Sequence, residues 1–157
     1  LGYLGLGDLF VLIFFGPVAV AGTFYVQALE ITPVVIFAGL GPGLLATALL
    51  AVNNLRDEPT DKKVGKLTLA VRFGTTFARA EYLAALVFSA VIPFILAFWT
   101  ETHWYACISA LIIIPGFSSI RQIISGVKGS ELNTTLASTG KLILIYGILF
   151  SLGWWIG

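Results

Sequence analysis

The sequence contains few charged residues, and this shortage decides the class of protein. Only 11% of the 157 residues are charged, whereas an average soluble domain carries about 25%. Hydrophobic residues make up 58% of the chain, and the mean hydropathy is +0.97. The composition therefore excludes an ordinary soluble domain and predicts an integral membrane protein.

Three further absences bear on the sites, the partners and the extent of the chain. Cys107 is the only cysteine and lies in an apolar run, which excludes a disulfide and a thiol-based metal site. The net charge of +1, without a basic stripe, indicates that nucleic acid is not a partner. The sequence has no methionine and no cleavable signal pattern at its start. We therefore expect the C-terminal part of a longer protein, or an incompletely defined chain.

Five apolar runs are long enough to suggest membrane spans. A spanning helix needs about 20 mostly apolar residues, and backbone groups in lipid must be paired within the segment. Because strand-like alternation is absent, the runs predict an all-α, multi-pass transmembrane helical bundle with about five spanning helices. The fifth run is long enough if it extends back past Lys141, whose side chain would snorkel to the interface. The runs are Leu9–Val26, Pro33–Val52, Tyr82–Trp99, Trp104–Ile120 and Leu142–Ile156.

The basic residues all fall on one side of such a bundle. The connections around Glu30 and from Glu101 to His103 contain no lysine or arginine. Because basic residues gather on the cytoplasmic side, we expect a bacterial-type inner-membrane protein with a cytoplasmic connection at 53–79. The basic residues are Arg56, Lys62, Lys63, Lys66, Arg72 and Arg79 between the second and third runs, and Arg121, Lys128 and Lys141 between the fourth and fifth.

The most polar block, NNLRDEPTDKKVGKLTLAVRFG, runs from Asn53 to Gly74. Its Asn53, Asp57 and Asp61 are spaced i, i+4 and i+8, so on a helix they would share one face. Pro59 disfavours helical geometry at the preceding residue. We therefore expect the second span to end near Asp57, and a short turn to restart with Pro59 and to stop at Gly65.

Two carboxylates and an amide oxygen are ligands that suit Mg²⁺. Four cations, Lys62, Lys63, Lys66 and Arg72, could balance a phosphate. The alternative is a solvated loop that only sets topology, in which Arg56 pairs with Glu58 or a neighbouring carboxylate. Tyr3 and Asp8 precede the first span on the same side, where they would approach the site or anchor the interface. Gly39, Gly41 and Gly43 flank Pro42 and predict close helix packing with a kink.

The pattern N-x3-D-x3-D followed by G-K-x-T-L-A-V-R-x-G resembles the second aspartate-rich motif of the UbiA superfamily of intramembrane prenyltransferases. The similarity is strongest to its menaquinone-pathway branch. Three further segments, 2–8, 14–17 and 43–48, are also similar to that branch. The matching motif residues are Asn53, Asn54, Leu55, Arg56, Asp57, Asp61, Gly65, Lys66, Thr68, Leu69, Ala70, Val71, Arg72 and Gly74.

The resemblance implies a fold of nine helices in two pseudo-repeats, each with one aspartate-rich motif. This chain, residues 1–157, looks like helices five to nine, the C-terminal part of a UbiA-type transmembrane domain. No second N-x3-D-x3-D pattern is present in the sequence. The resemblance therefore implies an upstream half that bears the first motif, and a chain that is inactive alone.

By resemblance, the chain is the second half of a Mg²⁺-dependent aromatic prenyltransferase. The reaction would transfer a prenyl group from a polyprenyl diphosphate to 1,4-dihydroxy-2-naphthoate within the lipid bilayer, giving demethylmenaquinone. Asp57 and Asp61 would bind Mg²⁺, and Asn53 would orient or join the metal ligands. Lys66 and Arg72 would hold phosphate oxygens.

Three other functions are compatible with the sequence. The chain could belong to a UbiA-type transferase with another aromatic acceptor, or it could be a non-catalytic accessory membrane subunit. A transporter would be favoured by acidic residues within the spans. No acid lies in the middle of any of the five runs as bounded above, which argues against that class.

Overall fold

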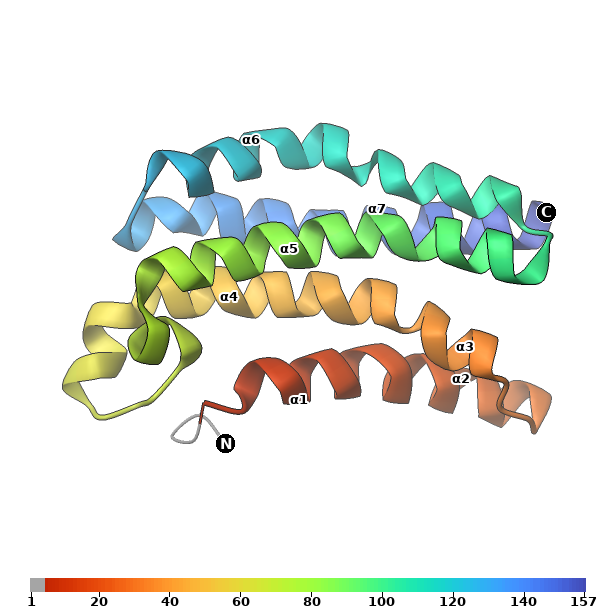
Figure 1. Cartoon of the computed structure of the whole chain (residues 1–157), viewed down its shortest axis with the longest axis horizontal. Helices are drawn as coiled ribbons and strands as arrows, with labels where there is room; N and C mark the ends of the chain where they lie inside the picture. Colours follow the sequence, from red (N-terminus) through yellow and green to blue (C-terminus); the bar gives the residue numbers. More distant parts are fainter. Residues whose placement is uncertain (1–4) are drawn as a thin grey trace.

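A computed structural model describes residues 5–157, and every regular element in it is helical (Figure 1). Seven α-helices are joined by short π and 3-10 segments. The first span contains a π-helical turn at Phe14–Val18, and 3-10 segments at Trp104–Ile112 and Gly129–Glu131 precede the last two α-helices. The α-helices are α1 (Gly7–Ile13), α2 (Ala19–Ala28), α3 (Pro33–Ala38), α4 (Leu40–Lys63), α5 (Leu69–Thr100), α6 (Ile113–Ser125) and α7 (Leu132–Ile156).

These elements form five helical rods that are long and apolar enough to cross a membrane, as the sequence predicts. The α4–α5 and α6–α7 connections lie at one end of the bundle with the start of α1, and the other connections lie at the opposite end with the C-terminus (Figure 1). The one-sided charge pattern thus coincides with one end of the bundle. The rods are Gly7–Ala28, Pro33–Lys63, Leu69–Thr100, Trp104–Ser125 and Gly129–Ile156.

The first two rods are kinked where glycines bring their backbones together. Gly16 has non-helical backbone angles beside Pro17, and the second rod bends at Gly39. A Cβ atom on Gly43 would lie 2.6 Å from the carbonyl oxygen of Leu12, and one on Gly16 would lie 2.7 Å from that of Gly39. Side chains at these positions would push the rods apart. The predicted close packing with a kink is therefore confirmed.

Helix α4 forms the centre of the bundle, because α1, α5 and α7 all pack against it. The aromatic ring of Tyr146 on α7 lies over Gly41 of α4. On the other side of the core, the hydroxyl of Tyr82 on α5 hydrogen-bonds that of Thr139 on α7 at 3.1 Å. Helix α4 is therefore held in place by three neighbouring helices.

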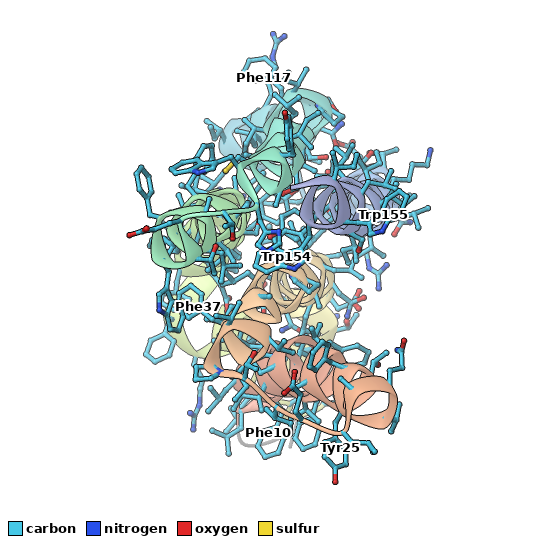
Figure 2. All side chains as sticks on the ribbon, turned by 90° about the vertical axis from the view of Figure 1, so that its right-hand side faces the viewer. Phe10, Tyr25, Phe37, Phe117, Trp154 and Trp155 are labelled. Atoms are coloured by element: carbon cyan, nitrogen blue, oxygen red, sulfur yellow. The ribbon has the colours of Figure 1, made fainter. Side chains whose placement is uncertain are left out.

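The outer surface of the bundle is apolar, as expected for contact with lipid tails. Figure 2 looks along the bundle from the end opposite the polar block, with Phe117 and Tyr25 pointing outward and Trp154 pointing inward between helices. The Trp154 ring stacks on His103 with ring centroids 4.0 Å apart. His103 is thus used structurally at this end, far from the aspartate motif.

The predicted cytoplasmic connection at 53–79 is mostly helical rather than a loop. Helix α4 continues to Lys63, and α5 begins at Leu69 with Thr68 as its N-cap, whose hydroxyl accepts a hydrogen bond from the Val71 amide at 3.3 Å. Residues 64–68 are irregular, and Gly74 interrupts α5 with non-helical backbone angles (φ 85°, ψ 169°). Charged residues suggest a loop in a membrane protein, yet lysine, arginine and glutamate are good helix formers, so the helices extend past their apolar sections.

Labelling of engineered cysteines tests the orientation of the bundle. We expect Lys63→Cys and Thr102→Cys, each in a Cys107→Ala background, to react with a membrane-impermeant thiol reagent from opposite sides. Position 63 should react from the cytoplasmic side, because the basic residues gather at its end of the bundle. Reaction of both positions from the same side would contradict the five-span topology.

Candidate functional site

The candidate site lies on the last turns of α4, which continue unbroken through Pro59. The predicted break near Asp57 is therefore wrong. Proline removes one backbone donor, and the buried Leu55 and Asp61 on either side of it keep the helix packed against its neighbours. Gly65, with a φ of 72°, ends the segment after Lys63 as predicted.

The motif is divided between two sides of this helix. A residue turns by about 100° along an α-helix, so each four-residue step rotates a side chain by about 40°. Asp57 therefore stays close in direction to Asn53, but Asp61 is turned by about 80° and comes within about 20° of Asn54. The three side chains therefore do not share the single face expected from the spacing, but belong to two clusters.

The first cluster surrounds the guanidinium group of Arg56. Its Nε and Nη2 donate hydrogen bonds to the two carboxylate oxygens of Asp57 at 2.7 and 2.8 Å. Its Nη2 also donates to Oδ1 of Asn53 at 2.8 Å, and its Nη1 donates to Oδ1 of Asn133 on α7 at 2.9 Å. The alternative that Arg56 pairs with a neighbouring carboxylate is confirmed, and that carboxylate is Asp57.

The second cluster joins Asp61 to Lys66. The chain reverses at Gly65, and the Nζ atom of Lys66 lies 3.1 and 3.3 Å from the two carboxylate oxygens of Asp61. The Lys66 amide also donates to the Asp61 carbonyl at 2.9 Å. The turn at Gly65 therefore brings Lys66 back to the motif, whereas Lys62 and Lys63 are exposed.

Asp8 lies beside the second cluster and is buried at the start of α1. The side-chain amide of Asn54 donates to its Oδ1 at 3.3 Å, and both residues are only 4% exposed. A cavity of about 70 Å³ separates α1 from the 64–68 turn at this point. Asp8 thus approaches the site rather than acting as an interfacial anchor, while Tyr3 lies outside the described residues. The cavity is lined by Gly5, Gly7, Asp8, Leu50, Asn54, Lys66 and Thr68.

Two features of the site are not apparent from the spacing of the motif. Asn54, next to the predicted ligand Asn53, is the asparagine that faces α1, and its burial depends on which side of α4 that helix covers. Asn133 reaches the motif from α7. The adjacent asparagines at the end of an apolar run were the available sequence signal for Asn54, whereas no pattern marks Asn133.

Arg72 is not brought to the two aspartates. It is exposed, and its side chain lies beside Gly5, where a Cβ atom would be 3.2 Å from its Cδ and Nη1 atoms. Within residues 5–157, the ion pairs are Arg56–Asp57 and Lys66–Asp61. The predicted phosphate role of Arg72 therefore has no support from a contact with the motif.

The oxygen donors of α4 suit a hard cation but do not surround one. Asn53 Oδ1 and Asp57 Oδ2 both contact Nη2 of Arg56, so a positive group already lies between a carboxylate and an amide oxygen. In the part of the chain that the structure describes, no three His, Cys, Asp or Glu side chains are grouped as a metal site. Mg²⁺ binds through one or two carboxylates and completes its shell with water and phosphate oxygens, so these residues fit part of a Mg²⁺ site.

Glu81 lies in α5 immediately before the apolar run that begins at Tyr82, between that run and the break at Gly74. Glu81 is half-buried and, with Thr47, lines an otherwise apolar groove of about 390 Å³ between α4 and α5. Glu81 thus lies toward the end of α5 that carries the polar block, and not in the middle of the apolar run.

Comparisons with known proteins decide the family. Residues 1–136 match the model of the UbiA prenyltransferase family. The chain belongs to the UbiA prenyltransferase family. This membership disfavours the transporter interpretation, and it agrees with the aspartate-rich motif on α4.

Several curated UbiA relatives align along nearly all of the chain. It is 39% identical over 158 aligned residues to the 1,4-dihydroxy-2-naphthoate octaprenyltransferase of Haemophilus influenzae, an alignment that covers 99% of the chain and 51% of that protein. It is 36% identical to the enzyme of that name from Escherichia coli, covering 97% and 49%. It is 35% identical to human UbiA prenyltransferase domain-containing protein 1, covering 96% and 43%. The chain thus spans about half the length of the curated relatives it matches.

A double-mutant cycle tests the contact between α1 and the motif helix. Because Asp8 and Asn54 are buried together, we expect Asp8→Ala and Asn54→Ala to be non-additive, with a coupling free energy of about 1 kcal/mol. The free energy of unfolding in detergent micelles is the measured quantity. Asp8→Ala combined with Lys62→Ala is the control and should be additive, and additivity in the Asp8–Asn54 cycle as well would contradict the contact.

Proposed function

We propose that this chain forms the second half of a prenyltransferase that transfers a polyprenyl group from its diphosphate to 1,4-dihydroxy-2-naphthoate. The observation that carries the proposal is the pairing of motif carboxylates and cations at one end of an apolar helical bundle. The names of the curated bacterial relatives support this acceptor. The proposal includes an upstream half with the first aspartate-rich motif, without which this chain is inactive.

The residues at the end of α4 would receive the diphosphate. Asp57 and Asp61 would hold Mg²⁺, with Asn53 as an amide ligand or an orienting group. Bound Mg²⁺ would neutralise charge on the diphosphate oxygens and favour their departure. Lys66, which lies 3.1 Å from Asp61, would carry a further positive charge to those oxygens. Arg72 would join it only after its side chain moves from Gly5.

The apolar helices would protect the reaction from water. Cleavage of the allylic C–O bond leaves the electron pair on the diphosphate and a positive charge on the prenyl carbon, which water would capture. A site without water prevents that side reaction. The ring carbon that carries the carboxylate forms the new C–C bond, and the carboxylate leaves as CO₂. Because no electrons are removed, the first product is the reduced form of demethylmenaquinone.

A transferase with another aromatic acceptor is the second candidate. The chain is 34–35% identical to several proteins named UbiA prenyltransferase domain-containing protein 1, a name that specifies no acceptor. A panel of hydroxylated aromatic acids, each offered with the same polyprenyl diphosphate, distinguishes the two candidates. Preference for 1,4-dihydroxy-2-naphthoate supports the first, and preference for a benzoate supports the second.

The role of the aspartates is tested in the full-length protein, reconstituted in lipid nanodiscs. Asp57→Asn preserves the shape of the side chain but removes its charge, so we expect prenyl transfer to fall by about 10²- to 10³-fold. Glu58→Gln, on the same turn, is the control and should retain activity within a few-fold. Near-normal transfer by Asp57→Asn would rule out the metal role, and activity of residues 1–157 alone would contradict the two-half arrangement.

The lysines of the motif are expected to divide their roles. Lys66 is paired inside the site, so Lys66→Ala should raise KM for the polyprenyl diphosphate by about tenfold while leaving KM for the acceptor nearly unchanged. Lys62 and Lys63 are exposed, and their alanine variants should stay within about threefold of wild type, since exposed charges contribute about 1 kcal/mol or less. Equal losses in all three variants would instead indicate a diffuse basic patch.

A further inference from the structure

Arg56 is bound by three side chains from two helices. Its guanidinium group donates to both carboxylate oxygens of Asp57 at 2.7 and 2.8 Å and to Asn53 at 2.8 Å. The remaining contact is with Asn133 on α7 at 2.9 Å. The Arg56 and Asp57 side chains are 26% and 32% exposed, so solvent and ions can reach this cluster.

Two of these acceptors are the residues that the proposed function assigns to the metal. Nη2 of Arg56 is 2.8 Å from both Asn53 Oδ1 and Asp57 Oδ2. Mg²⁺ would bind the same oxygens at about 2.0–2.1 Å. A guanidinium nitrogen and a metal ion cannot both occupy the space between two oxygens, and their positive charges repel. Binding of the ion therefore requires Arg56 to leave these oxygens.

The third acceptor, Asn133, is a contact that Arg56 can keep after it leaves the α4 oxygens. Asn133 is neutral and lies on α7, so it holds the guanidinium without attracting a metal ion as a carboxylate would. Its partner Nη1 is the nitrogen that contacts neither Asn53 nor Asp57. The arginine can therefore release its two α4 partners while it retains the α7 contact.

We propose that Arg56 is a displaceable internal cation, which occupies the oxygens of Asn53 and Asp57 until a divalent ion replaces it and which Asn133 then keeps beside the site. This inference rests on the proposed function, because it uses the metal role of Asp57. The internal cation stabilises a carboxylate at the end of an apolar bundle, where an unpaired charge is costly. The released guanidinium can bind phosphate oxygens in a bidentate way, so Arg56 and Asn133 act as positioning residues for the diphosphate.

Metal binding without substrate provides the test. The full-length protein in lipid nanodiscs is titrated with Mn²⁺, without diphosphate, and free Mn²⁺ is measured by electron paramagnetic resonance. Asp57→Asn identifies the Mn²⁺ site that belongs to this motif. We expect Arg56→Lys to bind Mn²⁺ at that site about tenfold more tightly, because lysine keeps the charge but lacks the planar fork that holds several oxygens. Arg121→Lys, at an exposed arginine of α6, is the matched control and should be unchanged.

A rescue experiment separates displacement from a general effect of charge. In Arg56→Ala, added methylguanidinium ions should weaken Mn²⁺ binding competitively, whereas they should have no effect on the wild type. Asn133→Ala should leave Mn²⁺ affinity within about threefold but raise KM for the polyprenyl diphosphate by about tenfold, as expected when a phosphate-binding arginine loses its anchor. Unchanged KM in Asn133→Ala would overturn the assignment of Asn133.

The outcomes distinguish this inference from the proposed function. If Asp57→Asn removes no Mn²⁺ site, the metal role of the motif fails and the inference fails with it. If Asp57→Asn removes a site but Arg56→Lys and Arg56→Ala bind Mn²⁺ no more tightly than wild type, the proposed function stands and the displacement by Arg56 is wrong. Tighter binding in both arginine variants, with competition by methylguanidinium, supports it.

Discussion

Three carboxylates at the polar end of the bundle, those of Asp57, Asp61 and Asp8, each have a partner from the same chain, and the rest of the site depends on this pairing. Asp57 pairs with Arg56, Asp61 with Lys66, and Asp8 accepts a hydrogen bond from Asn54. An unpaired charge beside an apolar bundle would lose hydration without compensation. The pairs stabilise acidic oxygens at a place that a cationic ligand can reach. In our proposal, that ligand must first displace the internal cation that is paired with them.

The helical framework explains why these pairs form where they do. Helix α4 is held by α1, α5 and α7, and close contacts at Gly16, Gly43 and Gly41 fix its position along the bundle. Its motif turns therefore have one neighbour on each side: α1 supplies Asp8 and α7 supplies Asn133. Precise placement of ligands by rigid elements is what an electrostatic catalyst requires.

The oxygen donors of α4 do not by themselves surround a metal ion. The oxygens of Asn53, Asp57 and Asp61 are spread over two sides of α4, and within the described residues they do not join a third acidic or imidazole group. A chain that spans about half the length of its UbiA relatives would leave the remaining ligands to the other half and to the diphosphate itself. This fits our proposal that catalysis requires both motifs.

The membrane class, the five spans, the end of the bundle that carries the basic residues and the importance of the polar block could all be predicted from the amino-acid sequence. The length of the apolar runs and the placement of charges are read directly from the sequence, so predictions based on them do not depend on how the helices pack. The sequence also indicated that the segment would stop at Gly65. It failed at Pro59, where packing on both sides keeps α4 helical. The pairing of Asn54 with Asp8 of α1 and of Arg56 with Asn133 of α7 could be found only in the folded chain, because the neighbours of each side of a helix are set by how distant segments pack around it.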